Sequence, residues 1–274
     1  SHIHIRKKIM EINSLFNVTG KVVVVTGGSR GIGEMITAGF LANGAKVYIS
    51  ARKAPPLMEK AKELSERYNA ECIAIPCDLS TIEGMDYFTQ QITEKEEGID
   101  FLINNAGAAW GEPLEDFSET GWDKVMDLNV KSIFFLTQKL KSLLKTNATI
   151  DDPSRVINIG SIDGLNVPAF ETYSYSTSKA AVHHLTRVLA NKLVKEDILV
   201  NAIAPGPYPS AMLGSAVNSD YSFIADANPR KRVGTPEDIA GLAIFLCSRA
   251  GAYTVGETIT SDGGLVKTAG HKLG

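Results

Sequence analysis

The 274-residue sequence has only three cysteines, Cys72, Cys77 and Cys247, and no Cys-x-x-Cys pair or Cys/His ligand spacing. An odd number of widely spaced cysteines argues against a disulfide framework and against a structural zinc site. We therefore expect all three thiols to lie in the protein core, and we predict no bound metal.

Long apolar runs are also missing, since no segment reaches the ~18 residues that cross a bilayer. Ser1–Met10 lacks the apolar region and cleavage site of a secretory signal. These absences favour a soluble, cytoplasmic protein without a membrane partner. Residues 1–17 are interpreted as an N-terminal extension. Its leading Ser-His-Ile-His is an expression remnant or a processed start, with Met10 the candidate natural start.

No charge of one sign dominates, because 28 basic and 31 acidic residues give a net charge of −3. Charges scattered in this way indicate no nucleic-acid partner and favour small-molecule chemistry. The length allows one large hydrophobic core, so residues 18–274 are expected to form a single domain.

A β-branched run, Lys21–Thr26, predicts a strand that is buried on both faces of a parallel sheet. A glycine-rich turn follows it and opens a helical pattern that stops at Asn43-Gly44. Glycines let the backbone approach a pyrophosphate, and a helix N-terminus supplies amide donors, although an ordinary tight turn is the alternative. No Gly-Lys-Ser/Thr follows, so the turn is not a P-loop. The predicted cradle comprises Gly27, Ser29, Arg30, Gly31, Ile32 and Gly33.

The next strand, Lys46–Ser50, ends in basic residues, and no Asp or Glu occurs between Glu34 and Glu59. An acid at this point would hold the ribose 2′-hydroxyl of NAD, whereas a basic residue accommodates the 2′-phosphate of NADP. We predict that Arg30 and Arg52 bind this phosphate and that the cofactor is NADP(H). The alternative is that both arginines are solvated surface charges.

Strand and helix patterns continue to alternate along the chain, which predicts an α/β fold with a Rossmann-type doubly wound parallel sheet flanked by helices. Ligands bind such sheets beyond the carboxyl ends of the strands. The third strand ends at Asp78 and Leu79, which we predict to contact the adenine, unless Asp78 instead caps the following helix. The expected segments here are a helix over Leu57–Asn69, a strand over Glu71–Leu79, a helix over Thr81–Thr93 and a strand over Asp100–Asn104.

Tyr175 and Lys179 lie four residues apart in a segment that continues into a helical pattern starting near Tyr173. On a helix they share one face, and a nearby cation lowers the pKa of a phenol from its usual value near ~10. The pair is suited to proton transfer, unless it is a chance pair on a solvated helix. Tyr173 faces elsewhere and is at most a substrate wall, and His183 and His184 are expected to be structural.

Five motifs occur in the order found in short-chain dehydrogenases/reductases, which the sequence resembles from about Gly20 to Gly264. They are Thr26–Gly33, Asn104–Gly107, Ser161, Tyr175–Lys179 and Pro205–Gly206. The resemblance implies that Asn129 orders a water and that Ser161 binds the substrate oxygen. It implies that Tyr175 is the acid/base and that Lys179 lowers its pKa and holds the nicotinamide ribose.

The same resemblance extends the predicted cofactor site. Asn105, Ala106 and Gly107 match a family motif, Pro205 and Gly206 flank the nicotinamide in relatives, and Ser210 replaces a threonine that contacts the cofactor amide. Residues of about 207–232 are expected to form a mobile substrate lid, with a surface loop as the alternative. A homodimer or homotetramer is expected by analogy.

The sequence is also similar to 3-oxoacyl reductases, including the branch linked to bacterial rhamnolipid synthesis. This implies NADPH-dependent reduction of a 3-oxoacyl or similar medium-sized carbonyl substrate, such as an acyl thioester. The alternatives are a polyol or secondary-alcohol dehydrogenase and a catalytically silent NADP-sensing protein. Four lysines could attract an acidic carrier protein, although they are equally compatible with solvated helix charges: Lys131, Lys139, Lys141 and Lys145.

Overall fold

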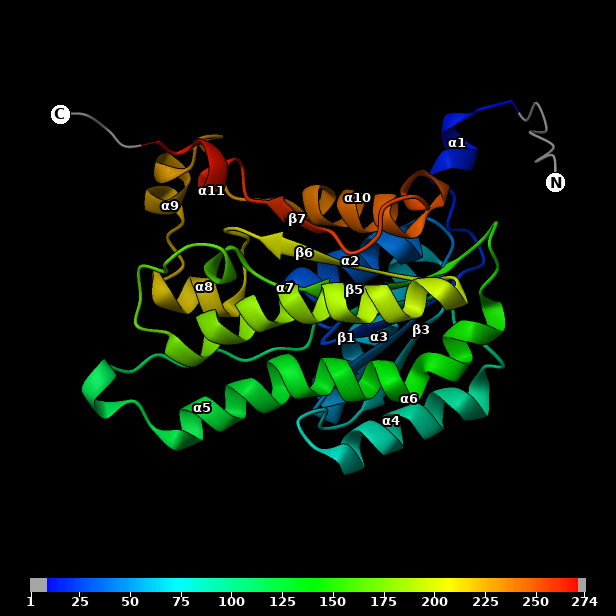
Figure 1. Cartoon of the computed structure of the whole chain (residues 1–274), viewed down its shortest axis with the longest axis horizontal. Coiled ribbons are helices and arrows are strands. Elements are labelled where there is room, and N and C mark those ends of the chain that lie inside the picture. Colours follow the sequence, from blue (N-terminus) through cyan, green and yellow to red (C-terminus); the bar gives the residue numbers. More distant parts are fainter. Residues whose placement is uncertain (1–8, 271–274) are drawn as a thin grey trace.

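A seven-stranded sheet forms the centre of the structure, a computed structural model that describes residues 9–270 (Figure 1). All neighbouring strands are parallel, in the order β3-β2-β1-β4-β5-β6-β7. This confirms the predicted doubly wound sheet. The strands are β1 (Val22–Thr26), β2 (Lys46–Ala51), β3 (Cys72–Pro76), β4 (Phe101–Asn104), β5 (Ser154–Ile159), β6 (Ile198–Pro205) and β7 (Thr258–Ser261). The leading Ser-His-Ile-His lies outside the described residues.

Helices fill both faces of this sheet. Within residues 9–270, no helix has the length and apolarity of a membrane span. The α-helices are α1 (Ile12–Leu15), α2 (Gly31–Ala42), α3 (Ala54–Tyr68), α4 (Ile82–Lys95), α5 (Glu119–Met126), α6 (Ser132–Asn147), α7 (Tyr173–Leu193), α8 (Ala211–Ala216), α9 (Ser222–Ala227), α10 (Pro236–Cys247) and α11 (Leu265–Thr268). The 3₁₀ and π segments are η1 (Leu114–Asp116), η2 (Asp127–Lys131), η3 (Ile162–Gly164), η4 (Val194–Glu196) and η5 (Arg249–Gly251).

The valine run of β1 explains how the two helix layers are held. Successive strand side chains point to opposite faces. Val23 and Val25 accordingly pack with α2, α3 and α10, and Val24 packs with α4, α6 and α7. Figure 1 shows α10 and α7 on opposite sides of the strands. A strand covered on both faces has no solvent-facing position, which is why its pattern is continuous rather than alternating.

The strand order fixes where a ligand can bind. β1 pairs with β2 on one side and β4 on the other, so the chain reverses its direction of winding there. Doubly wound sheets bind ligands at such a switch point, beyond the carboxyl ends of the strands. The residues that follow β1, β4, β5 and β6 therefore meet at one edge of the sheet.

Three sequence expectations differ in detail from the structure. α3 begins at Ala54 rather than Leu57, because Pro55 and Pro56 fit the first turn of a helix. The idea that Asp78 caps α4 is wrong, since the Thr81 side chain accepts from the Gly84 N–H at 3.0 Å. The cysteines are free, but only Cys72 and Cys247 are buried, and Cys77 is half-buried.

The segment expected as a lid contains two short helices, α8 and α9, that weak periodicity did not reveal. The Ser210 hydroxyl accepts from the Leu213 N–H at 3.1 Å, and the Tyr221 hydroxyl donates to the Ser210 carbonyl at 3.3 Å. At the base of the segment, the Gly234 N–H donates to the Pro207 carbonyl at 2.9 Å. Its role as a lid stays a prediction.

Arg155 on β5 is a buried arginine that the sequence pattern did not single out, with 1% of its surface exposed. Its guanidinium donates to the carbonyls of Pro153 at 2.8 Å, Cys247 at 3.3 Å and Ser248 at 2.9 Å. Two of these carbonyls end α10, so Arg155 satisfies groups that a helix C-terminus leaves without partners. Burial lowers the pKa of Arg155.

Replacing Arg155 by Met should lower the free energy of unfolding by about 2 to 4 kcal/mol, because several buried carbonyls lose their donor. Urea unfolding measures the change. Arg249→Met is the matched control, since Arg249 is exposed, and it should change stability by at most about 0.5 kcal/mol. An Arg155→Met protein as stable as the parent would contradict this role.

Candidate active site

The glycine turn after β1 is packed too closely for side chains. Gly27 and Gly31 have φ values of +63° and +56°, which favour glycine. A Cβ at Gly33 would lie 2.1 Å from the Gly27 carbonyl oxygen and 2.4 Å from the Asn105 side-chain nitrogen. The turn therefore keeps its backbone bare at the N-terminus of α2, as a phosphate cradle requires.

A single hydroxyl ties this turn to the loop after β4. Thr26 Oγ1 accepts from the backbone N–H groups of Asn105 and Ala106, each at 2.9 Å. The Asn105 side chain donates to the Gly27 carbonyl at 3.1 Å, and the Ser50 hydroxyl accepts from the Gly27 N–H at 3.3 Å. The predicted cofactor residues at these two strand ends thus form one connected surface.

The two predicted phosphate-binding arginines are both exposed, Arg30 at the start of α2 and Arg52 after β2. Among residues 9–270, neither takes part in an ion pair. A hydrogen bond from Ser80 lowers the pKa of Asp78, and the charge of Arg52 lowers it further. Asp78 and Arg52 thus lie near each other. The Leu79 side chain is instead buried in the core.

Tyr175, Lys179 and Ser161 come together where α7 meets the end of β5. The Lys179 Nζ lies 5.5 Å from the centre of the Tyr175 ring and donates to the Ile159 carbonyl at 2.9 Å. The Ser161 side chain lies close enough to Tyr175 to act on its pKa through a hydrogen bond. Ser161 Oγ also accepts from the Asp163 N–H at 3.1 Å.

The pKa of the phenol departs from the sequence expectation. Burial raises the pKa of Tyr175 to about 12, while Ser161 lowers it and the charge of Asp163 raises it. Burial also lowers the pKa of Lys179 to about 8. The Tyr175 pKa is thus raised rather than lowered, because desolvation is its largest cause and the charge of Lys179 is not among the causes. That Lys179 lowers the pKa of Tyr175 during the reaction stays a prediction. At neutral pH the phenol is protonated.

Asn129 lies in the π-helical segment η2, between α5 and α6, and is buried. Its Oδ1 accepts from the Ala108 N–H at 2.8 Å, and its Nδ2 donates to the Ala108 carbonyl at 2.9 Å and to Ser178 Oγ at 3.1 Å. Asn129 thus positions the backbone next to Gly107. Both of its amide donors are used, which leaves only acceptor capacity on Oδ1 for the predicted water.

Tyr173 and two further predicted residues, Gly206 and Ser210, lie outside the group formed by Tyr175, Lys179 and Ser161. The Tyr173 hydroxyl donates to Glu171 at 2.9 Å and its ring packs edge-on against Phe117 at 5.6 Å, as expected for a different helix face. The Gly206 N–H donates to the Ser261 carbonyl at 3.0 Å. A Cβ at Gly31 would lie 3.6 Å from the Ser210 Cβ, so the lid base adjoins the glycine turn.

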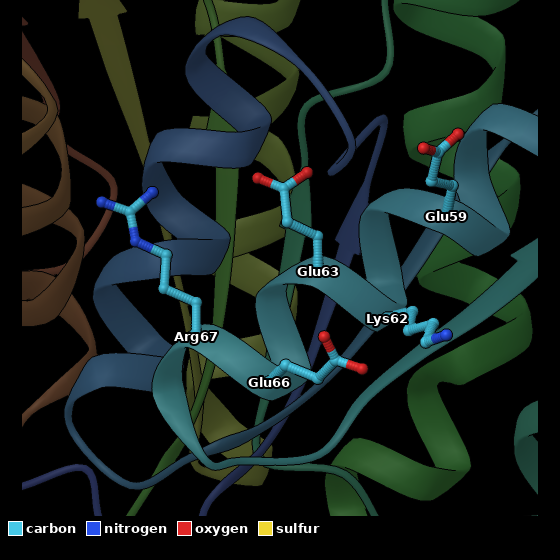
Figure 2. A pocket seen from close by; sticks show the side chains of 5 residues that line it. All are labelled: Glu59, Lys62, Glu63, Glu66 and Arg67. Atoms are coloured by element: carbon cyan, nitrogen blue, oxygen red, sulfur yellow. The ribbon is translucent and has the colours of Figure 1, made fainter.

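A surface hollow lies on α3, away from the predicted site residues. It has a volume of about 570 Å³. Figure 2 shows its lining side chains, which are exposed along one face of the helix. Three acids and two bases line it and none of them is buried, so this surface offers no catalytic arrangement. The lining residues are Glu59, Lys62, Glu63, Glu66 and Arg67.

The doubly wound fold and the residues that meet at the carboxyl edge of its sheet define an oxidoreductase with a dinucleotide-binding fold. The family model described as enoyl-(acyl carrier protein) reductase matches residues 18–266. The chain belongs to the short-chain dehydrogenase/reductase family.

Individual relatives cover nearly the whole chain. The rhamnolipids biosynthesis 3-oxoacyl-[acyl-carrier-protein] reductase of Pseudomonas aeruginosa is 46% identical over 251 residues, covering 91% of this chain and 97% of the relative. The solved Pseudomonas aeruginosa RhlG/NADP active-site complex has a TM-score of 0.88 and 45% identity, covering 92% and 98% of the two chains. The L-sorbose reductase of Gluconobacter frateurii, solved with NADPH and L-sorbose, has a TM-score of 0.85 and 30% identity, with coverages of 93% and 99%.

Residues that sequence reasoning missed include Ser178, which links Asn129 to α7, and Ser50, which holds the glycine turn. His183 was expected to be structural, and its Nε2 accepts from the Ser161 N–H at 3.3 Å, a contact that sequence reasoning did not predict. Its helical spacing from Lys179 was the available signal, since residues four apart share a face.

The Gly33→Ala change should destabilise the protein by about 2 kcal/mol or more, because the new methyl group meets backbone and has no space. Gly241→Ala is the matched control. A Cβ at that exposed position on α10 meets nothing within 4 Å, so stability should rise by about 0.5 to 1 kcal/mol. Thermal unfolding of both variants measures the contrast, and equal shifts in the same direction would contradict the packing of the turn.

Proposed function

We propose that this oxidoreductase uses NADPH to reduce a ketone to a secondary alcohol, with a 3-oxoacyl or similar medium-sized substrate. The observation that carries the proposal is the meeting of Ser161, Tyr175 and Lys179 at the carboxyl edge of the sheet. The bare glycine turn lies at the same edge.

The residues present fit NADP(H). A Cβ at Gly33 would fill the cradle, and Arg52 directly follows strand β2, where an acid would select NAD. In the proposal, Arg30 and Arg52 bind the 2′-phosphate and the turn of Gly27–Gly33 holds the pyrophosphate. Two relatives solved with NADP or NADPH support this choice.

When bound, NADPH supplies the hydride. The chain's own groups handle the charge that then develops on the carbonyl oxygen, which needs donors in place and a proton within reach. Ser161 donates a hydrogen bond to that oxygen, and Tyr175 gives it the proton. Because burial raises the pKa of Tyr175 to about 12, the phenol holds its proton at neutral pH. The protonated phenol is the form that can give a proton to the substrate oxygen.

The substrate choice is supported by the relative from Pseudomonas aeruginosa, whose name specifies a 3-oxoacyl group on an acyl carrier protein. The lysine cluster adds little support for a carrier. Lys139 pairs with Asp86 at 2.5 Å and Lys141 with Glu196 at 2.9 Å, and Lys145 donates to the Glu196 carbonyl. These contacts favour ordinary helix charges over a docking surface.

The alternative substrate class is a polyol or another secondary alcohol, which the likeness to L-sorbose reductase favours. A catalytically silent NADP sensor is less consistent with the site, because a sensor needs only the cradle. We also propose a homodimer or homotetramer, formed through α6 and α7. These helices carry Phe134 and Val188, whose side chains are exposed.

Changing Tyr175 to Phe should lower kcat by about 10²- to 10⁴-fold, because the proton donor is lost, with little change in NADPH affinity. NADPH oxidation with 3-oxoacyl thioesters, sugars and diketones measures this. Tyr173→Phe is the control and should keep activity. Turnover that survives Tyr175→Phe would refute the mechanism, and NADPH binding without turnover of any substrate would favour the sensor.

The Arg52→Ala change should weaken NADPH binding by about tenfold to a hundredfold and leave NADH binding unchanged, since a charged hydrogen bond to phosphate is lost. Fluorescence titration with each cofactor measures it. Arg67→Ala, on the exposed face of α3, is the control. Equal affinity of the parent for NADPH and NADH would defeat the cofactor assignment.

A further inference from the structure

His183 is a buried histidine on α7, one helical turn beyond Lys179, with 4% of its surface exposed. Its ring lies against the backbone on both sides of Ser161. A Cβ at Gly160 would be 2.0 Å from His183 Nε2, and one at Gly164 would be 2.9 Å from Cε1. The two glycines leave the space that the imidazole occupies.

One hydrogen bond sets the protonation of this ring. The backbone N–H of Ser161 donates to His183 Nε2 at 3.3 Å. A backbone N–H can only donate, so Nε2 bears the lone pair and the proton of the neutral ring is on Nδ1. Burial, together with the charges of Lys179 and Arg187, lowers the pKa of His183 to about 4, which keeps it a neutral acceptor at neutral pH.

The other ring nitrogen shows that packing alone does not explain the histidine. Nδ1 is buried and has no hydrogen-bond partner among residues 9–270. A buried donor without a partner is destabilising, and an apolar side chain of similar shape would avoid that cost. The feature that an apolar residue could not supply is the acceptor for Ser161.

Two contacts one turn apart join α7 to the end of β5. Lys179 donates to the Ile159 carbonyl at 2.9 Å, and His183 accepts from the Ser161 N–H. The Ser176 hydroxyl adds a third contact by donating to the Asp163 carbonyl at 2.7 Å. Because Tyr175 is on the same helix, these contacts determine how far Ser161 lies from the phenol.

We propose that His183 is a positioning residue that holds Ser161, through its backbone N–H, at the place where its hydroxyl and Tyr175 can bind one carbonyl oxygen. This inference rests on the proposed function for the roles of Ser161 and Tyr175. The hydrogen bond itself is independent of any substrate.

The first test compares two variants that fill the same space. His183→Leu removes the acceptor and should lower kcat by about tenfold to a hundredfold, since small misplacements of catalytic groups have effects of this size. NADPH affinity should not change. His183→Gln offers an amide oxygen near the position of Nε2 and should recover most of the activity.

The control is His184→Leu, on the exposed side of α7 beside Arg187, which should keep parent activity. Equal losses of kcat in His183→Leu and His183→Gln would overturn the proposal, as would loss of NADPH affinity in step with kcat. Thermal unfolding is measured alongside, so that activity is compared per folded molecule.

The second test needs no variant to be active. Long-range ¹H–¹⁵N spectra of the ¹⁵N-histidine-labelled parent, assigned with His183→Gln, should show the Nδ1–H tautomer for His183. The Nε2–H tautomer would overturn the proposal whether or not a substrate is found. A parent that turns over no ketone would instead refute the proposed function and leave this hydrogen bond to be judged by its spectrum.

Discussion

The attachment of α7 to the carboxyl end of β5 is the constraint on which the catalytic edge depends. The helix carries Tyr175, the strand end carries Ser161, and the side chain of Lys179 bonds directly to the strand carbonyl at Ile159. Residues far apart in the sequence can share one substrate oxygen only if two rigid elements meet in a fixed register. Here that register comes from hydrogen bonds between side chains of α7 and backbone groups at the strand end.

Much of this arrangement was predictable because it follows from local patterns. The valine run of β1 alternates between two helix layers, so its continuous apolarity indicated a strand covered on both faces. Thr235 and Pro236 begin α10 with a capping box, and both are residue types that are common at the start of a helix. The glycine turn was also predictable from the sequence, because Gly27 and Gly31 adopt positive φ values that glycine reaches without strain.

The features that escaped prediction depend on contacts between distant segments. The burial that raises the pKa of Tyr175 comes from the packed fold and not from the spacing of Tyr175 and Lys179. Arg155 lies near the start of β5, and nothing in the local sequence indicates that its guanidinium binds carbonyls at the end of α10. Asp78 and Thr81 lie about one helical turn apart in a short polar segment, and both residue types are suitable N-caps. The sequence therefore did not decide which of them caps α4.

The hydrogen bond between Gly234 and Pro207 has a consequence for how this fold can diversify. It closes the base of the segment that contains α8 and α9, and lengthening a closed surface loop costs little free energy. The residues between can therefore change in number and character while β6 and the glycine turn keep their places. If this segment covers the substrate, as we predict, a change in its length and sequence would alter the substrate preference and leave the residues at the catalytic edge unchanged.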